Sequence, residues 1–505
     1  MFSLPRVCAI SATILRGPKA VLAAVSDPVE VDRVRQRFQA CDQGHVFDCW
    51  ETLTAAQQTA LLHQASALAE DLPGLVEGQR KAVAALDAVP DAAAISPAEP
   101  IRLPQSSEDE RRRDAARDAG LGVLGQGRVA MCVVAGGQGT RLGFSGPKGA
   151  YPLGPVSDRC LFALQAQKIR GLARRSGCRV PWYVMTSAST DAATRALFEA
   201  QGNFGLDSGD VFIFSQGMLP AWDFEGRLIL AAPHRIAESP NGHGGAPLAL
   251  GQSGALDDME ARGIDRLFYY QVDNPLIRMG DPVFVGLHEE TGSEMSCKVI
   301  RKRAAADKMG VVAEVRGRPT VIEYTEIPPD LRDSRDDGGQ LVYWAGNIAI
   351  HLFDRDFLRR IAAESELCLP FHASPKAIES VDSDAKTRAS TGPNGYKLER
   401  FVFDALPWAE RTCLMEVRAE EEFSPIKNAE GKDSPESSRA QLVARYRSWL
   451  GQAGIEVPPG VEAIEVDHSV IDSPADVTES GFSDLADAGK AILVSTGSTG
   501  SGMDA

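Results

Sequence analysis

The chain has 505 residues and is 44% hydrophobic, which excludes a disordered chain or one small core and predicts about two or three packed domains. Asp and Glu number 69 against 53 Lys and Arg, and the resulting net charge of -16 argues against a protein that binds the nucleic-acid backbone. No apolar run approaches the roughly 20 residues that cross a bilayer, so we expect a soluble protein with no membrane partner.

The nine cysteines are scattered along the chain and are odd in number. The sequence has neither a CxxC pair nor an HExxH motif, which argues against a disulfide framework and against a zinc site. We therefore expect reduced thiols and a cytoplasmic protein.

The N-terminal quarter is predicted to be mostly helical. Residues 1–27 are expected to form a flexible extension, because charges and a proline soon interrupt their short apolar stretch. Residues 28–120 show the apolar spacing of helices and are predicted to form a helical N-terminal region. The clearest apolar stripe comprises Leu61, Leu62, Ala65 and Leu68.

Residues 121–417 are predicted to form an α/β catalytic domain. Strand-like runs such as VAMCVVA and VPWYVMTS alternate there with helical segments, and VVAEV, TVIEY and VYWAGNIAIHLF favour an antiparallel or mixed extension of the same sheet. One helix is predicted in detail, with Ser157 or Asp158 as its cap and Gly177 at its end. Its buried stripe comprises Leu161, Leu164 and Leu172.

The end of the chain divides into two further segments. Residues 418–490 are predicted to form a smaller C-terminal domain with a final helix in QLVARYRSWL. Residues 491–505 are predicted to be a disordered tail, since STGSTGSGMDA is rich in glycine and serine.

The segment Val133–Gly149, VVAGGQGTRLGFSGPKG, has the properties of a polyphosphate-binding loop. An apolar strand leads into glycines whose missing side chains let backbone N–H groups turn together toward an anion. Arg141 and Lys148 add positive charge for a leaving group. No GxxxxGK[ST] occurs in this segment, and Gly137, Gly139 and Gly143 miss the GxGxxG spacing by one residue, which argues against P-loop and Rossmann dinucleotide sites. A glycine triplet alone is more often a tight turn, and the two cations in the same window favour the functional interpretation.

Eight blocks in order resemble the eukaryotic-type UDP-sugar pyrophosphorylase family, most closely its UDP-N-acetylglucosamine branch. Together they span roughly residues 121–439, and eight ordered blocks are more specific than any one of them. The blocks are GGQGTRLG with PKG, SQGMLPA (215–221), NGHGG (241–245), QVDNPLIRMGDPVFVG (271–286), VIEYTEI (321–327), AGNIAIH (345–351), YKLERFVFD (396–404) and EEFSPIKNAEGKDSP (421–435).

The resemblance implies a nucleotidyltransferase-type, Rossmann-like mixed sheet and a uridylyl transfer. A sugar 1-phosphate oxygen would attack the α-phosphorus of UTP in line, and pyrophosphate would leave. Because no covalent enzyme intermediate is required, positioning and charge neutralisation would supply most of the acceleration. The implied partners are UTP and a sugar 1-phosphate, with Mg2+ as cofactor. No nucleic acid is expected, and protein partners are unknown.

The implied catalytic residues are cations that would surround the phosphates of the two substrates. Taken singly, each lysine of this set is more often a solvated surface residue, so the assignment depends on the matching KLE and SPIKNA blocks. The acidic chain makes such a local cationic cluster necessary for binding two anions. The residues are Arg141, Lys148, Lys397 and Lys427.

The nucleotide site needs an amide that distinguishes uracil from other bases, and Gln216 supplies a paired donor and acceptor. Asp273 follows the strand-like RLFYYQV, where a carboxylate at a strand end suits Mg2+, and its alternative role is a helix cap. Asp281, before Pro282, is interpreted as structural. The resemblance gives the nucleotide-binding residues as Val134, Ala135, Gly136, Gly137, Lys148, Gln216, Gly242, Asp273 and Lys397, with Asp273 also as metal ligand.

The sugar site is implied by the same resemblance. Glu323 would accept hydroxyl hydrogen bonds, Tyr324 would offer an apolar face, and Asn347 would hold a hydroxyl or acetamido group. Taken alone, a strand that ends in Glu-Tyr is common, so only the joint match carries this prediction. The sugar-binding residues would be His243, Gly310, Glu323, Tyr324, Asn347 and Lys427.

One departure bears on sugar choice, because His243 stands where the acetylglucosamine branch usually has asparagine. A histidine there is similar to the broad-specificity enzymes. The leading hypothesis is formation of UDP-N-acetylglucosamine, and the alternative is a broad-specificity or glucose/galactose-type pyrophosphorylase. A different class is an inactive nucleotide-sugar sensor. A glycosyltransferase would usually carry a DxD metal pair, whereas Asp273-Asn274 follows the strand here.

Overall fold

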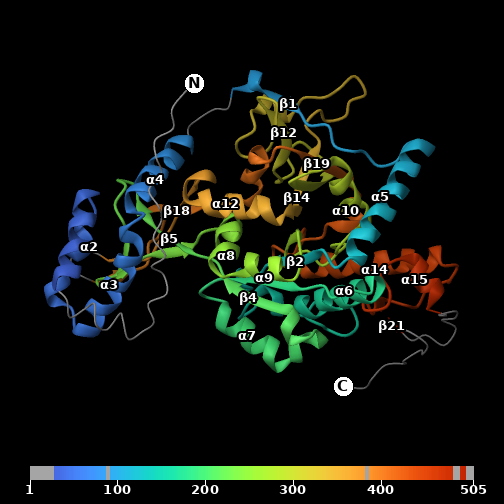
Figure 1. Ribbon diagram of the computed structural model, residues 1–505, viewed down its shortest axis with the longest axis horizontal. Coiled ribbons are helices and arrows are strands. Elements are labelled where there is room, and N and C mark those ends of the chain that lie inside the picture. Colours follow the sequence, from blue (N-terminus) through green and yellow to red (C-terminus); the bar gives the residue numbers. More distant parts are fainter. Residues whose placement is uncertain (1–27, 87–90, 382–385, 481–489, 496–505) are drawn as a thin grey trace. The chain divides into compact units, whose positions relative to one another are not determined.

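The computed structural model describes residues 28–86, 91–381, 386–480 and 490–495, apart from the side chains of 28 and 364–368 (Figure 1). The extension predicted for residues 1–27 lies outside the described residues. Within them, no helix is long and apolar enough to span a bilayer. The seven cysteines whose side chains are described, Cys41, Cys49, Cys132, Cys160, Cys178, Cys297 and Cys413, are free thiols.

Contacts group the chain into two compact units built from discontinuous segments. The first unit comprises residues 1–87, 218–239 and 370–399, and the second comprises 88–217, 240–369 and 400–505. This grouping differs from the contiguous ranges expected from the sequence, because two segments from the middle of the chain pack with the N-terminal helices.

The first unit packs three helices against small sheets. Helix α3 is capped by Thr54, whose side chain and Gln57 form a reciprocal capping box. The predicted stripe from Leu61 to Leu68 is buried, and Trp222 and Leu398 belong to the same core. The helices are α2 (Pro28–Ala40), α3 (Ala55–Ala69) and α4 (Leu72–Leu86), and the strands are β5 (Met218–Pro220), β6 (Trp222–Asp223), β7 (Leu230–Ala232), β8 (Arg235–Ile236), β9 (Glu238–Pro240), β15 (His372–Lys376), β16 (Ser380–Val381), β17 (Thr387–Arg388) and β18 (Gly395–Glu399).

The second unit is built on a mixed sheet, which confirms the α/β fold class predicted above. Its strand order is β1-β12-β14-β10-β2-β3-β4, with β13 beside β12 and with β11 between β14 and β19. Strands β10, β2, β3 and β4 are parallel neighbours, and β14 joins β10 antiparallel. The strands are β1 (Ile95–Pro97), β2 (Val129–Val134), β3 (Trp182–Thr186), β4 (Val211–Ser215), β10 (Arg266–Gln271), β11 (Met295–Arg301), β12 (Val311–Val315), β13 (Arg318–Ile322), β14 (Ala345–Asp354) and β19 (Thr412–Val417).

Helices cover both faces of this sheet. Alternate residues of β2 face opposite layers, since Met131 and Val133 pack with one core while Ala130 and Cys132 pack with the other. Figure 1 shows two groups of helices, with α8, α9 and α12 to the left of α5, α6 and α10. The helices are α5 (Ser107–Gly125), α6 (Leu161–Ser176), α7 (Asp191–Ala200), α8 (Ala246–Gln252), α9 (Ala255–Ala261), α10 (Pro282–Thr291), α11 (Pro329–Arg332), α12 (Arg355–Cys368), α13 (Ala419–Glu422), α14 (Pro435–Gln452) and α15 (Pro474–Glu479).

Strand β2, helix α6 and strand β3 form the predicted βαβ unit. The stripe Leu161, Leu164 and Leu172 is buried, and Gly177 ends α6 in a left-handed conformation, as predicted. The predicted cap is wrong, because Cys160 occupies that position without a side-chain hydrogen bond. Ser157 instead donates its hydroxyl to Glu465, whose buried carboxylate lies far away in sequence.

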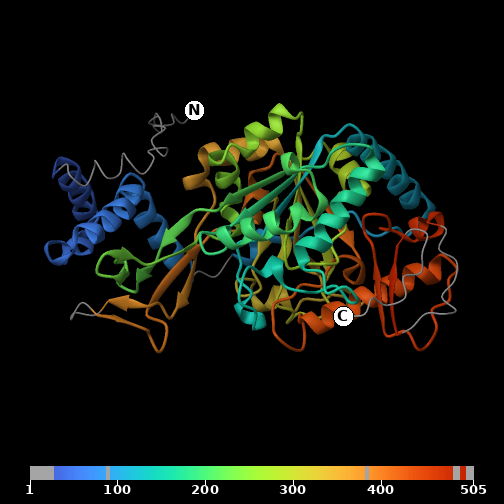
Figure 2. The same ribbon diagram turned by 90° about the horizontal axis from the view of Figure 1, so that it is seen from below.

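The C-terminal segment, drawn in red in Figure 2, belongs to the second unit. The predicted final helix is α14, and strand β20 (Ala463–Val466) pairs in parallel with β21 (Ala491–Val494). The predicted tail therefore begins too early, because apolar Ile492 and Val494 are buried in the main core. Residues 496–505 of that tail lie outside the described residues.

Candidate active site

The glycine loop leaves the sheet at the carboxyl end of β2. Strand β10 ends beside it, since Gln271 is the register partner of Val134 and the Val272 N–H donates to the Val134 carbonyl. Val134 is half-buried, Ala135 and Gly136 are buried, and Gly137 is exposed. Carboxyl ends of parallel strands are where ligands bind in open α/β sheets.

The loop closes on itself and brings Lys148 back toward its start. The Lys148 N–H donates to the Gly137 carbonyl at 3.0 Å, and Gln138 forms an isolated antiparallel bridge with Pro147. Arg141 lies in a short 3-10 turn, Thr140–Leu142, and its side chain is exposed. An exposed Gly137 and a returning lysine leave this end of β2 open to an anion.

Lys148, Asp273 and the segment before Lys427 converge in the structure. The Lys148 ammonium lies 3.3 Å from Asp273 Oδ2 and 3.4 Å from the Ile426 carbonyl oxygen. The Ile426 N–H donates to the Asp273 carbonyl at 2.9 Å. The next residue, Lys427, is exposed, and its backbone N–H donates to the Asp433 carbonyl. Two of the predicted lysines and the predicted aspartate therefore belong to one locality.

Gln216 follows β4 and packs directly against the glycine loop. A Cβ added at Gly136 would lie 2.4 Å from Gln216 Nε2, so any larger residue at 136 would displace the amide. The Gln216 N–H donates to the Thr186 carbonyl. Its side-chain oxygen is buried and accepts no hydrogen bond from the part of the chain that the structure describes. A buried acceptor at this place suits an N–H donor of a ligand.

The NGHGG block (241–245) packs against Phe401 and Val402. Gly242 has a φ of +79°, and the His243 ring stacks on Phe401 with centroids 5.3 Å apart. His243 Nδ1 accepts a hydrogen bond from the Val402 N–H at 3.1 Å. A ring nitrogen that accepts cannot carry hydrogen, so the hydrogen of the neutral imidazole is on Nε2. The N–H of the His243 ring is therefore at its other nitrogen.

The structure brings three of the predicted sugar residues together. The Asn347 N–H donates to the Gly310 carbonyl at 2.9 Å, and a Cβ on Gly310 would lie 3.1 Å from Glu323 Oε1. Asn347 Oδ1 already accepts from the Ala349 N–H, so its amide NH2 is the group left for a ligand. Tyr324 is 39% exposed, and its contact with a sugar stays a prediction.

Lys397 is placed differently from the other predicted cations. It lies on β18 of the first unit, opposite Ser374 in the three-stranded sheet β15-β18-β6. Lys148 and Lys427 belong to the second unit. The contribution of Lys397 to the phosphate site thus stays a prediction.

Two supporting residues were missed by the sequence reasoning. Ser187 Oγ donates to the Gly136 carbonyl at 2.7 Å, and it comes directly after strand β3. Asn274 bridges two chain segments, donating to the Glu422 carbonyl and accepting from the Ser424 N–H. Polar residues that follow a buried strand are the signal that would have found both. Asp281 is structural, as predicted, because it caps α10 and pairs with buried Lys298.

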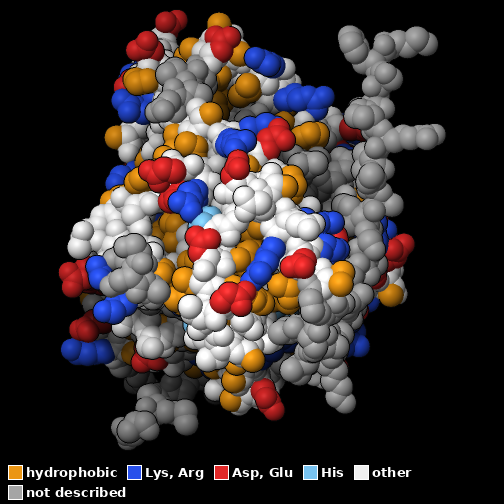
Figure 3. Space-filling model, turned by 90° about the vertical axis from the view of Figure 1, so that its left-hand side faces the viewer, with side chains coloured by type: hydrophobic (Ala, Val, Ile, Leu, Met, Phe, Trp, Pro, Cys, Tyr) orange, Lys and Arg blue, Asp and Glu red, His pale blue; other side chains and the backbone are white. Residues whose placement is uncertain are grey.

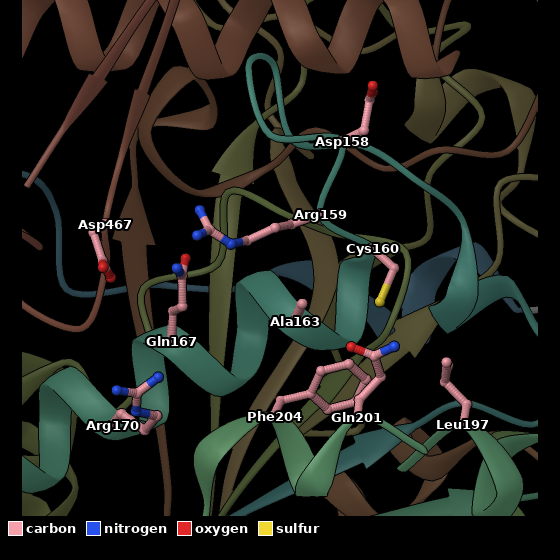
Figure 4. A pocket seen from close by; sticks show the side chains of 10 residues that line it. All are labelled: Asp158, Arg159, Cys160, Ala163, Gln167, Arg170, Leu197, Gln201, Phe204 and Asp467. Atoms are coloured by element: carbon pink, nitrogen blue, oxygen red, sulfur yellow. The ribbon is translucent and has the colours of Figure 1, made fainter. Parts of the chain in front are cut away.

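A separate pocket of about 460 Å3 lies between α6, the segment before it and the turn after α7 (Figure 4). Arg159, Gln167 and Phe204 line it, and Arg159 is already paired with Glu465 at 3.2 Å. Asp158 and Asp467 also belong to the lining, with the Asp158 carboxylate directed away from the other labelled side chains in Figure 4, so the lining residues carry both signs of charge. It contains none of the residues predicted for the nucleotide or the sugar.

The mixed sheet, with a glycine loop and converging lysines at the ends of its parallel strands, defines a nucleotidyltransferase. The family model described as UTP–glucose-1-phosphate uridylyltransferase matches residues 94–443, and the chain belongs to this family. Among similar proteins, human UDP-N-acetylhexosamine pyrophosphorylase-like protein 1 is 38% identical over 435 residues, covering 83% of this chain and 85% of that protein.

Two further relatives extend the similarity. The UDP-N-acetylglucosamine pyrophosphorylase of Saccharomyces cerevisiae is 36% identical over 442 residues, which cover 85% of this chain and 92% of that protein. The crystal structure of the uridine diphosphate N-acetylglucosamine pyrophosphorylase from Trypanosoma brucei matches with a TM-score of 0.80 at 25% identity, covering 92% of this chain and 98% of that one. The predicted family and fold are thereby confirmed.

Proposed function

We propose that the protein forms UDP-N-acetylglucosamine and pyrophosphate from UTP and N-acetylglucosamine 1-phosphate. The relatives from yeast and Trypanosoma brucei carry this activity in their names. The structural observation that supports it is the convergence of Lys148, Asp273 and the Ile426–Lys427 segment beside the glycine loop.

The proposed reaction is a single displacement at phosphorus. A phosphate oxygen of the sugar 1-phosphate bonds to the α-phosphorus, and the bond from that phosphorus to the bridging oxygen of pyrophosphate breaks. Lys148 and Lys427 would balance the negative charge of the two substrates and of the leaving group. Backbone N–H groups of the glycine loop would orient the triphosphate, and the buried Gln216 oxygen would accept the imide N–H of uracil.

Mg2+ is the proposed cofactor, with Asp273 as its protein ligand. Among the described residues no group of three or more His, Cys, Asp or Glu side chains is arranged to hold a metal ion. A single carboxylate such as that of Asp273 fits Mg2+, which commonly binds one or two carboxylates together with substrate phosphates and water. When bound, the ion would neutralise phosphate charge. The ligand would be the Asp273 carboxylate, which lies 3.3 Å from the Lys148 ammonium.

A reducing compartment, the cytoplasm, is the proposed location. Three free thiols, Cys132, Cys297 and Cys413, are buried in the second unit, and burial raises the pKa of each above its ordinary value. Buried, protonated thiols of this kind are stable where glutathione keeps cysteines reduced.

Pyrophosphate release from the full chain tests the proposed function. UTP with Mg2+ is combined in turn with the 1-phosphates of N-acetylglucosamine, glucose and galactose, and CTP replaces UTP as the base control. We expect N-acetylglucosamine 1-phosphate to give the highest kcat/KM and CTP to give little product. Preference for glucose or galactose 1-phosphate would contradict the proposed substrate, and uridine-nucleotide binding without turnover would indicate a sensor.

A further inference from the structure

The segment Val272–Ile277 carries Asp273 but has neither helix nor strand. All six residues are buried. The segment follows strand β10 and is followed by the half-buried Arg278. Buried backbone carbonyls without a partner are costly, so a segment of this kind must obtain its hydrogen bonds from elsewhere. The source of those bonds determines where Asp273 is held.

Two helices supply side-chain donors to these carbonyls. On α6, Gln165 donates to the Val272 oxygen at 2.9 Å, and Lys168 Nζ donates to Pro275 at 2.5 Å and to Ile277 at 2.8 Å. On α14, the Arg445 guanidinium donates to the Leu276 oxygen at 2.6 Å.

Further hydrogen bonds join this segment to residues 422–426, which directly precede Lys427. The Asp273 carbonyl accepts from the Ile426 N–H, while the Asn274 amide holds the Glu422 carbonyl and the Ser424 N–H. A shift of this segment would thus move the Asp273 carboxylate and the backbone next to Lys427 together.

Burial of the Lys168 and Arg445 side chains costs desolvation free energy that packing alone would not require. Lys168 is 2% exposed and Arg445 is 8% exposed, and neither forms an ion pair with any residue the structure describes. Burial, followed by the nearby charge of Arg445, lowers the pKa of Lys168 to about 7, while Asp472 and Glu422 oppose this shift. Apolar residues would fill the same space without this desolvation cost. Both side chains add bonds to carbonyls of the segment, and Arg445 in addition lies over the Trp449 ring at 4.6 Å from its centroid.

We propose that Lys168 and Arg445 are positioning residues that hold the Val272–Ile277 carbonyls and thereby set the place of Asp273 for uridylyl transfer. The inference rests on the proposed function, and it gives α14, in the C-terminal segment, a part in the reaction. Since catalysis by positioning depends on fractions of an ångström, loosening this segment slows the chemical step more than it weakens substrate binding.

The test compares Lys168→Met, which keeps the length of the side chain and removes its donors, with Arg174→Met as control. Arg174 lies on the same helix and also donates to two carbonyls, those of Ser469 and Val470, away from Asp273. We expect Lys168→Met to lower kcat by about 10²-fold, with the KM for UTP changed less than about threefold. Lys168→Arg should recover part of the loss, and Arg174→Met should keep the kcat of the unsubstituted protein.

A double-mutant cycle separates positioning from general damage. If Lys168 acts through Asp273, Lys168→Met should lower kcat far less in the Asp273→Asn background than in the unsubstituted protein. Equal losses in both backgrounds, or a Lys168→Met kcat within about twofold of the unsubstituted value, would overturn the inference. Should Lys168→Met fail to fold, Gln165→Leu tests the same carbonyl series at Val272.

Failure of the proposed function would be seen in a different measurement. An unsubstituted protein that turns over no sugar 1-phosphate contradicts the proposed function, and this inference falls with it. An active unsubstituted protein whose Lys168→Met variant is equally active contradicts the positioning role alone.

Discussion

At the residue scale, the site depends on glycines that let a side chain or a backbone segment approach closely. Gly136 leaves room for the Gln216 amide, and Gly244 leaves room for the backbone at Arg400, where an added Cβ would lie 2.5 Å from the carbonyl carbon. Glycine is required at both places because of close approach, since neither has a positive φ. The amino-acid pattern predicts a loop whose N–H groups turn toward an anion, and the structure adds this steric reason.

Lys148→Ala should lower turnover without an equal loss of sugar affinity. The ammonium lies beside Asp273 at the ends of β2 and β10, where it would balance charge on the departing pyrophosphate. Removing one such charge typically costs about 10²- to 10³-fold in kcat. Steady-state pyrophosphate release measures kcat and the KM for the sugar 1-phosphate. Lys432→Ala, at an exposed lysine paired with Asp307, is the control. Near-normal turnover of purified Lys148→Ala would remove Lys148 from the mechanism.

His351→Phe should make the fold less sensitive to acid. Burial, and then the nearby His243, lower the pKa of His351 to about 3, against 6.5 for an ordinary histidine. The unfolded chain therefore binds a proton more readily, so this residue costs stability as the pH falls from about 6.5 toward 3.

At pH 5 the cost is about 2 kcal/mol relative to pH 8, and phenylalanine removes it. Urea midpoints at the two pH values provide the measurement, and the surrounding Tyr269 and Phe353 rings should accept phenylalanine in place of imidazole. The exposed His63→Gln should lose as much stability in acid as the unsubstituted protein. An equal acid loss in His351→Phe would contradict this account.

At the element scale, helices α5 and α10 pack with their backbones almost in contact. A Cβ on Gly120 would lie 1.9 Å from the Pro282 carbonyl oxygen, and one on Gly286 would lie 1.7 Å from the Ala116 oxygen. The sequence predicts only a general helical region over residues 28–120, whereas α5 continues to Gly125. Close packing of this kind is a tertiary property, because it depends on which helix crosses the glycine.

Gly120→Ala and Gly122→Ala should have opposite effects on stability. Alanine at 120 must push against backbone of α10, which typically costs about 1–3 kcal/mol or more. The same change at 122, on the same helix, meets nothing within 4 Å and should stabilise by about 0.5–1 kcal/mol through helix propensity. Urea unfolding of the two variants compares them directly. A neutral Gly120→Ala would show that α5 and α10 can separate at little cost.

The start of α6 illustrates where local patterns are insufficient. Ser157 and Asp158 are favourable capping residues, and the sequence favoured them for that reason. In the structure Glu465 receives hydrogen bonds from the N–H groups of Val156 and Ser157 and from the Ser157 hydroxyl. A buried carboxylate about three hundred residues away in sequence thus competes for the serine, and no local rule includes it.

At the scale of the whole molecule, an acidic protein binds acidic substrates. On the face shown in Figure 3, blue Lys and Arg side chains are interspersed with red Asp and Glu. The net charge of -16 would repel a triphosphate at long range. Attraction must therefore come from cations gathered locally, such as Lys148 and Lys427.

A chain that ends after Gln452 should be unable to keep its fold. Such a truncation removes the buried apolar residues Ile464, Val466, Ile471 and Val477 from the main core. Each contributes about 1.5–3 kcal/mol, and their sum is comparable with the whole stability of a typical protein. Thermal unfolding of the shortened chain would show a strongly lowered midpoint or no cooperative transition. The exposed Glu462→Ala is the control, with a change expected within about 0.5 kcal/mol. A shortened chain as stable as the full one would contradict the placement of β20 and β21.

The amino-acid pattern alone determined the α/β class, the βαβ unit around α6 and the family, because periodicity and ordered blocks are local properties of the chain. It also indicated Lys148, Gln216 and Asp273, since each stands in a block with a matching neighbour. Only the tertiary structure decided that Ile426 meets Asp273 and that Lys168 and Arg445 hold the segment behind it. Those contacts join residues more than a hundred positions apart, and their formation depends on packing that no window of sequence contains.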